Sequence, residues 1–245
     1  MANAKLGFRI LPAPPRLPAS LVEQFRGIAS PNIADSMGRF NFMDAGIVSR
    51  SGIAVCGPAL TVNCRPADNL MVHKALQLAE RGDVVVVATG GNTVSAVFGG
   101  LMCEAASAKG IGGIVVDGAL RDVEDLTRLK FPAFSRALCP GGCDKDGPGE
   151  INVPISCGHA VVCPGDLIVG DADGVVVVPH AQAAEVLELV KQLIDRERGR
   201  VKEIQSGGLF RPDVDDTLRK RGVIDSGATG HVPRTRTSPS CRLRP

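Results

Sequence analysis

The central part of the chain alternates short apolar runs with segments of helical character. Val84 to Val87 and Ile114 to Val116 are continuous β-branched runs, which predict buried strands. A glycine-containing loop leads into a predicted helix of small residues from Leu101 to Lys109, and a shorter helix is predicted from Val123 to Leu129. This strand–helix–strand–helix order predicts parallel pairing and an α/β fold.

The segments before this region predict mixed structure. Leu21 to Gly27 begins a helix, and Ile53 to Val62 predicts a strand, a turn and a second strand because Gly57-Pro58 lies between its halves. Asn69 is predicted to cap a helix that runs from Leu70 to Leu78.

The segments after the centre predict a hairpin and a long helix. Leu167-Ile168-Val169 and Val175 to Val178 flank Asp171-Ala172-Asp173-Gly174, which favours a hairpin turn over the start of a calcium loop because the later ligands are missing. Apolar residues at helical spacing predict an amphipathic helix over residues 181–204.

These patterns divide the chain into three parts. Residues 1–20 form a Pro-rich lead-in, residues 21–208 form one domain, and residues 209–245 form a polar tail. The last stretch, from Thr229 to Pro245, combines arginines with Pro, Ser and Thr, so we expect it to be disordered.

Composition narrows the class of ligand. The 245 residues include no Trp and no Tyr, and 28 Lys and Arg against 26 Asp and Glu give a net charge of +2. Aromatic cages and base-stacking platforms are therefore not expected, and a balanced charge disfavours a nucleic-acid partner. Specificity is expected to come from backbone amides and charged groups acting on a small polar molecule.

Cysteine usage and hydropathy indicate a reduced, cytoplasmic protein. Arg and Pro interrupt the first twenty residues, so no secretory signal is predicted, and no apolar run reaches the roughly 20 residues of a membrane span. Most of the 8 cysteines lie among aliphatic residues. Cys139 and Cys143 could be half of a zinc site, but no second pair has suitable spacing, so zinc is not favoured.

The most informative segment joins a glycine loop to an Arg-Asp pair. Gly99-Gly100 stands at a helix entrance, which leaves the amides of Leu101 and Met102 free for an anion. Arg121 and Asp122 follow the next buried strand, where α/β proteins gather ligand groups. The alternative for Asp122 is a helix cap, since Asp125 follows at capping-box spacing.

Together these groups would bind a 2-oxo acid and a hard metal ion. No lysine is expected at this cluster, so a Schiff-base mechanism is less favoured. His73 and His180 are expected to be ordinary surface or hydrogen-bonded residues, because neither belongs to a recognisable triad.

Two blocks of sequence are distinctive when taken together. One runs from Gly99-Gly100-Leu101 through Asp117-Gly118-Ala119-Leu120-Arg121-Asp122, and the other contains Pro164-Gly165-Asp166 and Asp171-Ala172-Asp173-Gly174. These blocks resemble the 4-hydroxy-4-methyl-2-oxoglutarate aldolase/RraA-like family. The similarity extends over residues 21–208, and the two blocks together are fairly specific.

The resemblance implies an αββα sandwich related to swivelling phosphohistidine-like domains, with a C-terminal helical extension, assembled as a homotrimer or a dimer of trimers. It implies that Asp122 anchors Mg²⁺ or Mn²⁺ largely through waters and that Arg121 contacts the pyruvyl group. The amides of Leu101 and Met102 would receive the substrate carboxylate. Glu197 of a neighbouring subunit would complete the outer shell of the metal.

Two positions depart from the family pattern. Family enzymes often carry an acidic residue where this chain has Gly100, and His159 stands where Gly is expected.

The expected function is a divalent-metal-dependent class II aldolase that cleaves 4-hydroxy-2-oxo acids to pyruvate, with oxaloacetate decarboxylation as a side activity. The alternative is a non-catalytic regulator that binds a ribonuclease, because the family contains both kinds of protein.

Overall fold

The computed structural model describes residues 5–211 and 213–224. Its elements follow one another as β1 (Phe8–Ile10), α1 (Ala19–Phe25), α2 (Ser30–Ser36), β2 (Val48–Ser49), β3 (Val55–Cys64), α3 (Leu70–Leu78), β4 (Val84–Phe98), α4 (Gly100–Lys109), β5 (Gly113–Leu120), α5 (Val123–Arg128), β6 (Ala133–Leu138), β7 (Gly149–Ile151), β8 (Ile155–Cys157), β9 (Ala160–Val162), β10 (Leu167–Gly170), β11 (Val175–Val178), a 3₁₀ turn (His180–Gln182), α6 (Ala183–Gln205) and α7 (Asp213–Lys220).

The main sheet has the strand order β1-β7-β3-β4-β5-β6-β2. Strands β3, β4, β5 and β6 are parallel neighbours, joined through α3, α4 and α5. The parallel pairing predicted for the centre of the chain is therefore confirmed. Strand β10 pairs antiparallel with the first half of β3 and with β11, so a second, smaller group of strands branches from the main sheet.

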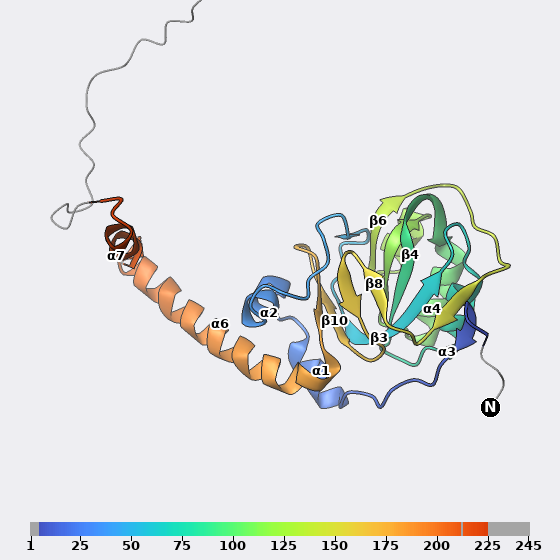
Figure 1. Cartoon of the computed structure of the whole chain (residues 1–245), viewed down its shortest axis with the longest axis horizontal. Helices are drawn as coiled ribbons and strands as arrows, with labels where there is room; N and C mark the ends of the chain where they lie inside the picture. The colour runs from blue at the N-terminus through green and yellow to red at the C-terminus, as the bar shows by residue number, and fades with distance from the viewer. Residues whose placement is uncertain (1–4, 212, 225–245) are drawn as a thin grey trace, which may run out of the picture. The chain divides into compact units, whose positions relative to one another are not determined.

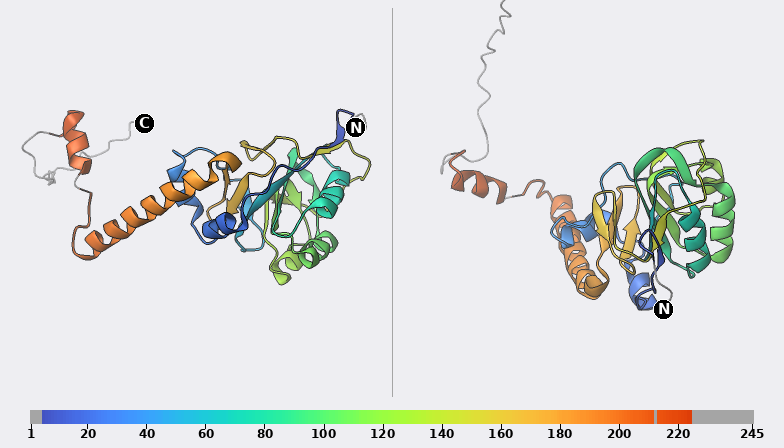
Figure 2. Two further views of the ribbon diagram at one scale, coloured as in Figure 1. Left: turned by 90° about the horizontal axis from the view of Figure 1, so that it is seen from below. Right: turned by 45° about the vertical axis from the view of Figure 1, so that its right-hand side comes forward.

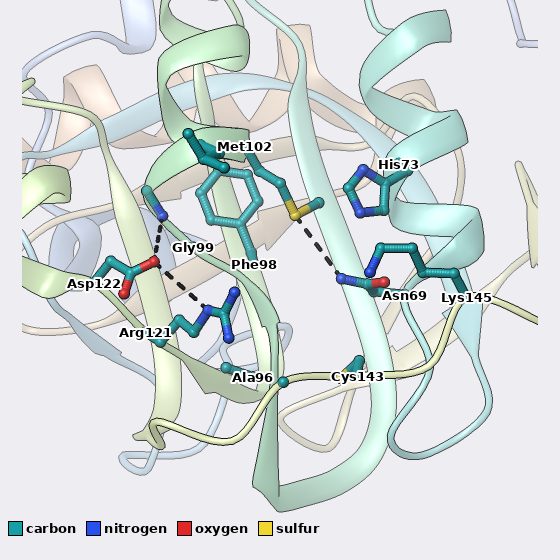
Figure 3. A pocket seen from close by; sticks show the side chains of 13 residues that line it. Asn69, His73, Ala96, Phe98, Gly99, Met102, Arg121, Asp122, Cys143 and Lys145 are labelled. Carbon is teal, nitrogen blue, oxygen red and sulfur yellow. Dashed lines mark hydrogen bonds and ion pairs between the residues drawn. The ribbon is translucent and has the colours of Figure 1, made fainter.

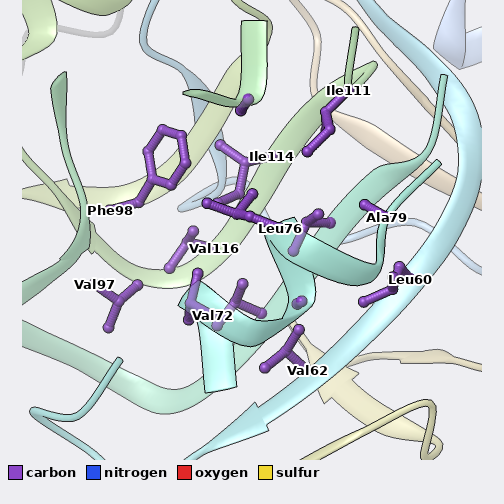
Figure 4. Packing of buried hydrophobic residues seen from close by; sticks show 14 of the residues in the cluster. Leu60, Val62, Val72, Leu76, Ala79, Val97, Phe98, Ile111, Ile114 and Val116 are labelled. Carbon is purple, nitrogen blue, oxygen red and sulfur yellow. The ribbon is translucent and has the colours of Figure 1, made fainter. Parts of the chain in front are cut away.

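The described residues up to Ile194 form one compact unit with an αββα arrangement. Helices α3, α4 and α5 cover one face of the main sheet over an aliphatic cluster that includes Val72 and Ile114 (Figure 4). Leu126 of α5 belongs to the same cluster. The opposite face packs against β8–β11. Helices α1, α2 and the start of α6 cover the outer side of β10 and β11 (Figure 1; Figure 2). The predicted α/β sandwich is confirmed.

Strand β3 is continuous, so the predicted strand–turn–strand over Ile53 to Val62 is wrong. The strand exchanges partners at Pro58 instead of turning: Val55–Pro58 pair with β10, and Ala59–Asn63 pair with β4. A Cβ atom on Gly57 would overlap the carbonyl oxygen of Gly82, so glycine permits this close backbone approach.

Asn69 is the N-cap residue of α3, as predicted. Its side chain makes no capping hydrogen bond, however, and Oδ1 of Asp68 accepts the N–H of Leu70 at 3.0 Å instead. The Asn69 amide turns inward, and its Nδ2 donates to the carbonyl of Val97 at 3.1 Å. Sequence cannot distinguish two adjacent capping residues when tertiary contacts decide between them.

The predicted hairpin is confirmed as β10–β11, with Gly170 opposite Val175. Asp171 also accepts hydrogen bonds from the N–H and hydroxyl of Ser30, both at 2.7 Å. This carboxylate therefore holds the N-terminus of α2, a structural role that agrees with the preference for a turn over a calcium loop.

The described residues after Ile194, 195–211 and 213–224, belong to a second unit that contains the rest of α6 and α7. Helix α7 lies in the stretch that was predicted as a polar tail, whereas the disorder predicted for residues 229–245 falls outside the described residues. Within the described parts of the chain, every helix is too short or too polar to cross a membrane.

Candidate functional site

A cavity of about 390 Å³ opens where β4 leads into α4, beside the end of β5. Figure 3 shows the cavity from close by. The residues that line it come from α3, β4, α4, the turn after β5 and the loop after β6: Asn69, His73, Ala96, Phe98, Gly99, Gly100, Leu101, Met102, Arg121, Asp122, Gly142, Cys143 and Lys145. Every residue predicted from the glycine loop and the Arg-Asp pair is in this set, so the structure brings them together.

The N-terminus of α4 presents two backbone donors to the cavity. Gly99 is the N-cap in an extended conformation, and its carbonyl accepts the N–H of Cys103 at 2.9 Å. Among the described residues, no acceptor is found for the N–H groups of Leu101 and Met102. Two free amides at the positive end of a helix suit a carboxylate.

Asp122 is the N-cap residue of α5, but its side chain reaches across to α4. Its backbone is left-handed (φ 57°), and its side chain makes no capping bond to α5. Instead, Oδ2 accepts the N–H of Gly100 at 2.8 Å and lies 3.6 Å from Nε of Arg121. The capping-box alternative is therefore wrong for α5, because this carboxylate binds the first amide of the neighbouring helix.

Both glycines at the start of α4 lie in close contact with side chains that follow β5. A Cβ on Gly99 would lie 2.6 Å from Oδ2 of Asp122 and 2.9 Å from Cγ of Arg121. A Cβ on Gly100 would overlap Oδ2 of Asp125, whose carboxylate also pairs with Arg128 at 2.9 Å. The place that a side chain at position 100 would enter is thus filled by a carboxylate from α5.

The opposite wall of the cavity consists of residues that the sequence analysis did not place there. Asn69 and His73 come from the start of α3, and Lys145 comes from the loop after β6 (Figure 3). His73 was expected to be an ordinary surface or hydrogen-bonded residue, and no lysine was expected at the site. Both expectations are wrong, because His73 and Lys145 line the cavity. No local spacing links these residues, because the loop is folded back by Oδ2 of Asp68, which accepts the N–H of Gly147 at 2.8 Å.

The pKa of His73 reflects its position in this wall of the cavity. Partial burial, and then the nearby charge of Lys145, hold the pKa of His73 below its usual value. This lowered pKa favours the neutral imidazole at pH 7. Lys145 itself is exposed, whereas a Schiff-base lysine needs a desolvated amine, so its presence does not favour covalent catalysis.

Cys139 and Cys143, the two cysteines of the loop after β6, have different surroundings. Cys143 lines the cavity, and burial raises the pKa of its thiol, which stays protonated. The thiol of Cys139 donates to the carbonyl of Val94 at 3.2 Å.

The carboxylate of Asp117 faces away from the cavity. It pairs with Arg136 at 2.7 Å and accepts the N–H of Gly158 at 3.0 Å.

Glu197 is an exposed residue of α6 within the second unit. Its predicted role toward a metal ion stays a prediction.

The donor set at the cavity fits a hard, hydrated cation. Oδ2 of Asp122 is engaged by Gly100, while the side chain is 44% exposed and keeps its second oxygen for a ligand. Over the described residues no cluster of three His, Cys, Asp or Glu side chains surrounds a common point. One carboxylate in a roomy polar cavity suits Mg²⁺, which retains several waters, better than it suits zinc.

The chain is similar to known proteins in sequence and in structure. The model of the RraA-like family, described as Aldolase/RraA, matches residues 30–177. A Halalkalibacterium halodurans protein provisionally named 4-hydroxy-4-methyl-2-oxoglutarate aldolase is 41% identical over 206 residues, which are 84% of this chain and 89% of that protein.

Two solved structures share the fold. An uncharacterized protein from Pseudomonas syringae has a TM-score of 0.70 and 28% identity, with 80% of this chain and 94% of that chain covered. A protein from Streptomyces coelicolor, described as an unusual member of the RNase ES inhibitor RraA protein family, has a TM-score of 0.68 and 28% identity over 77% of this chain and 98% of its own. The chain belongs to the RraA-like family.

Proposed function

We propose that the protein is a divalent-metal-dependent lyase that cleaves 4-hydroxy-2-oxo acids and releases pyruvate. The observation that carries this proposal is the meeting of two free helix amides, Arg121 and Asp122 in one cavity. A relative named as an aldolase supports the same reaction class.

The chain's own groups would act on the 2-oxo acid end of the substrate. The amides of Leu101 and Met102 bind the carboxylate, and the guanidinium of Arg121 faces the 2-oxo oxygen, where negative charge develops. In the reaction, the C4 hydroxyl loses a proton, the C3–C4 bond breaks to give a carbonyl product, and C3 of the remaining enolate gains a proton to give pyruvate. Oxaloacetate decarboxylation would pass through the same enolate.

Asp122 would hold the metal, and Mg²⁺ or Mn²⁺ bound there would supply Lewis-acid stabilisation of the enolate oxygen. Asp122 also fixes the first amide of α4, so one carboxylate orients both the cation and the anion site.

A coupled assay for pyruvate tests the proposal. Purified protein is assayed with 4-hydroxy-4-methyl-2-oxoglutarate and with oxaloacetate, after chelation and then with Mg²⁺ or Mn²⁺ restored. We expect turnover that requires the metal. Absence of metal-dependent turnover on both substrates overturns the proposal.

We also propose that the protein acts as a homotrimer or a dimer of trimers in which Glu197 serves the site of a neighbouring subunit. Mixing inactive Asp122→Ala and Glu197→Ala chains tests this directly. If the two residues belong to different subunits of one site, mixed oligomers regain activity, whereas sites built within a single chain do not.

A ribonuclease regulator is the second candidate, favoured by the structural similarity to a member of the RNase ES inhibitor family. Capture of a ribonuclease by the tagged protein, together with no Mg²⁺ binding in calorimetry, would support this function over the lyase.

A further inference from the structure

The loop after β6 carries two thiols that lie against neighbouring residues of β4. The thiol of Cys139 donates to the carbonyl of Val94 at 3.2 Å. The hydroxyl of Ser95, the next residue of β4, donates to the sulfur of Cys143. Because Val94 and Ser95 are consecutive, the two sulfur atoms are held at adjacent positions along one strand.

The segment between the two thiols is short and able to change its conformation. The N–H of Gly141 donates to the sulfur of Cys139 at 3.4 Å, so the chain turns back toward this cysteine. Cys143 follows two residues later, and its Cα is therefore within about 7 Å of the Cα of Gly141. A disulfide needs Cα atoms roughly 4.4–6.8 Å apart. Gly141 and Gly142 are both exposed, and glycine supplies the backbone freedom for such an approach.

Formation of an S–S bond in this loop would change the candidate site. Gly142 and Cys143 line the cavity (Figure 3), and a Cβ on Gly142 would lie only 3.2 Å from Nη1 of Arg121. The sulfur atoms can join only after they leave Val94 and Ser95. Gly142 has to move with them, and this movement alters the surroundings of the Arg121 guanidinium.

We infer that Cys139 and Cys143 are a redox pair that a hydroperoxide converts to a disulfide, and that this disulfide inhibits the site by displacing Gly142 beside Arg121. The inhibition rests on the proposed function, whereas the disulfide itself does not. Within the parts of the chain that the structure describes, these thiols belong to no group of three side chains that could hold a metal ion.

The two thiols have different roles in the oxidation. Burial raises the pKa of Cys143, which stays protonated and acts second. First, the sulfur of Cys139 attacks the hydroperoxide, the O–O bond breaks, an alcohol leaves with the thiol proton, and a sulfenic acid remains. The sulfur of Cys143 then attacks the sulfenic sulfur, the S–O bond breaks, the S–S bond forms, and water leaves with the second proton. Two thiols and one hydroperoxide thus give one disulfide, one alcohol and one water, and a dithiol reductant restores the thiols.

Mass spectrometry tests the pair directly, because both cysteines lie in one tryptic peptide, residues 137–145, that contains no other cysteine. Reduced protein is treated with hydrogen peroxide, the remaining thiols are alkylated, and the peptide is analysed. We expect this peptide to lose two hydrogen atoms about tenfold faster than Cys163, an exposed thiol outside the loop, is oxidised. Cys143→Ser should instead accumulate a sulfenic acid at Cys139, which dimedone traps.

Two results in this experiment overturn the inference. One is a peptide that keeps both alkylated thiols while Cys163 is oxidised. The other is Cys139 bound to a cysteine outside the peptide.

Pyruvate release measures the inhibition. Peroxide should reduce turnover of the wild type about tenfold or more, and dithiothreitol should restore it. Cys139→Ser should keep its own turnover through the same treatment, whereas Cys163→Ser, the matched control, should be inhibited like the wild type. A disulfide that leaves turnover unchanged overturns the inhibition. A disulfide in a protein that turns over no hydroxy-oxo acid contradicts the proposed lyase and supports the redox pair alone.

Discussion

The carboxylate of Asp122 accepts the backbone N–H of Gly100 at 2.8 Å, so the residue that precedes α5 closes the N-terminus of α4. The structural and chemical roles of Asp122 can therefore be separated. In Asp122→Asn the amide oxygen can still accept this N–H, and Asn tolerates the left-handed backbone, but the negative charge is lost.

We expect Asp122→Asn to lose metal-supported turnover by about a hundredfold or more with little change in stability. Asp122→Ala should lose both turnover and about 1 kcal/mol of unfolding free energy, because the cap is removed. Pyruvate release and urea unfolding measure the two effects. Full activity of Asp122→Asn would show that only the hydrogen bond matters.

A second prediction concerns the contact between Gly100 and Asp125. A methyl group at position 100 would overlap the Asp125 carboxylate, which is 46% exposed and can move aside only by disturbing its ion pair with Arg128, so Gly100→Ala should cost less than about 1 kcal/mol. In an Asp125→Ala background no carboxylate has to move, and Gly100→Ala should be neutral or stabilising because alanine favours a helix more than glycine. Additive effects in this double-mutant cycle, measured by urea unfolding, would contradict the contact.

Only the local half of the site could be predicted from sequence. Gly99-Gly100 and the Arg121-Asp122 pair are each contiguous, and parallel pairing of β4 with β5 brings their ends to one edge of the sheet. The sequence pattern contains that information. The contact of Asp122 with α4, by contrast, depends on its left-handed backbone, and the same sequence is equally consistent with a capping box for α5.

The other half depends on long-range folding. Lys145 reaches the cavity because Asp68, far away in sequence, holds the loop that carries it, and Asn69 lines the wall because its amide turns inward instead of capping α3. The same limit applies to β3, where Gly57-Pro58 marks an exchange of partner strands and not a turn. Spacing along the chain carries no signal for such contacts.

A third prediction follows from the pair formed by Asp44 and Arg136, which are 2.7 Å apart. The hydrogen bond from Arg136 holds the pKa of Asp44 below its usual 3.8, even though burial acts in the opposite direction. Because the folded pKa is depressed, the stabilisation is complete well above pH 3.8 and is lost as the pH falls through the folded value.

Asp44→Asn should therefore reduce the free energy of unfolding by about 1–2 kcal/mol at pH 7, and this difference from the wild type should shrink below about pH 4. Asp35→Asn is the matched control, because the pair of Asp35 with Arg39 is 50% and 81% exposed and should contribute little at any pH. Urea unfolding between pH 3 and pH 7 measures the difference. A loss that is equally large at pH 3 would contradict this account of the pair.

The fourth prediction concerns His159, which stands where glycine was expected. Gly158 and His159 have φ values of 54° and 63° in the turn between β8 and β9, and two successive positive φ values favour glycine in the second position. The imidazole is 86% exposed and lies 3.5 Å from Asp44, so its contact contributes little at neutral pH.

His159→Gly should relieve the left-handed strain and stabilise the protein by about 0.5–1 kcal/mol. His159→Ala keeps the strain and loses the contact, so thermal unfolding of the two variants beside the wild type separates backbone conformation from side-chain charge. A loss of stability in His159→Gly as large as that in His159→Ala would show that the imidazole, and not the backbone, decides this turn.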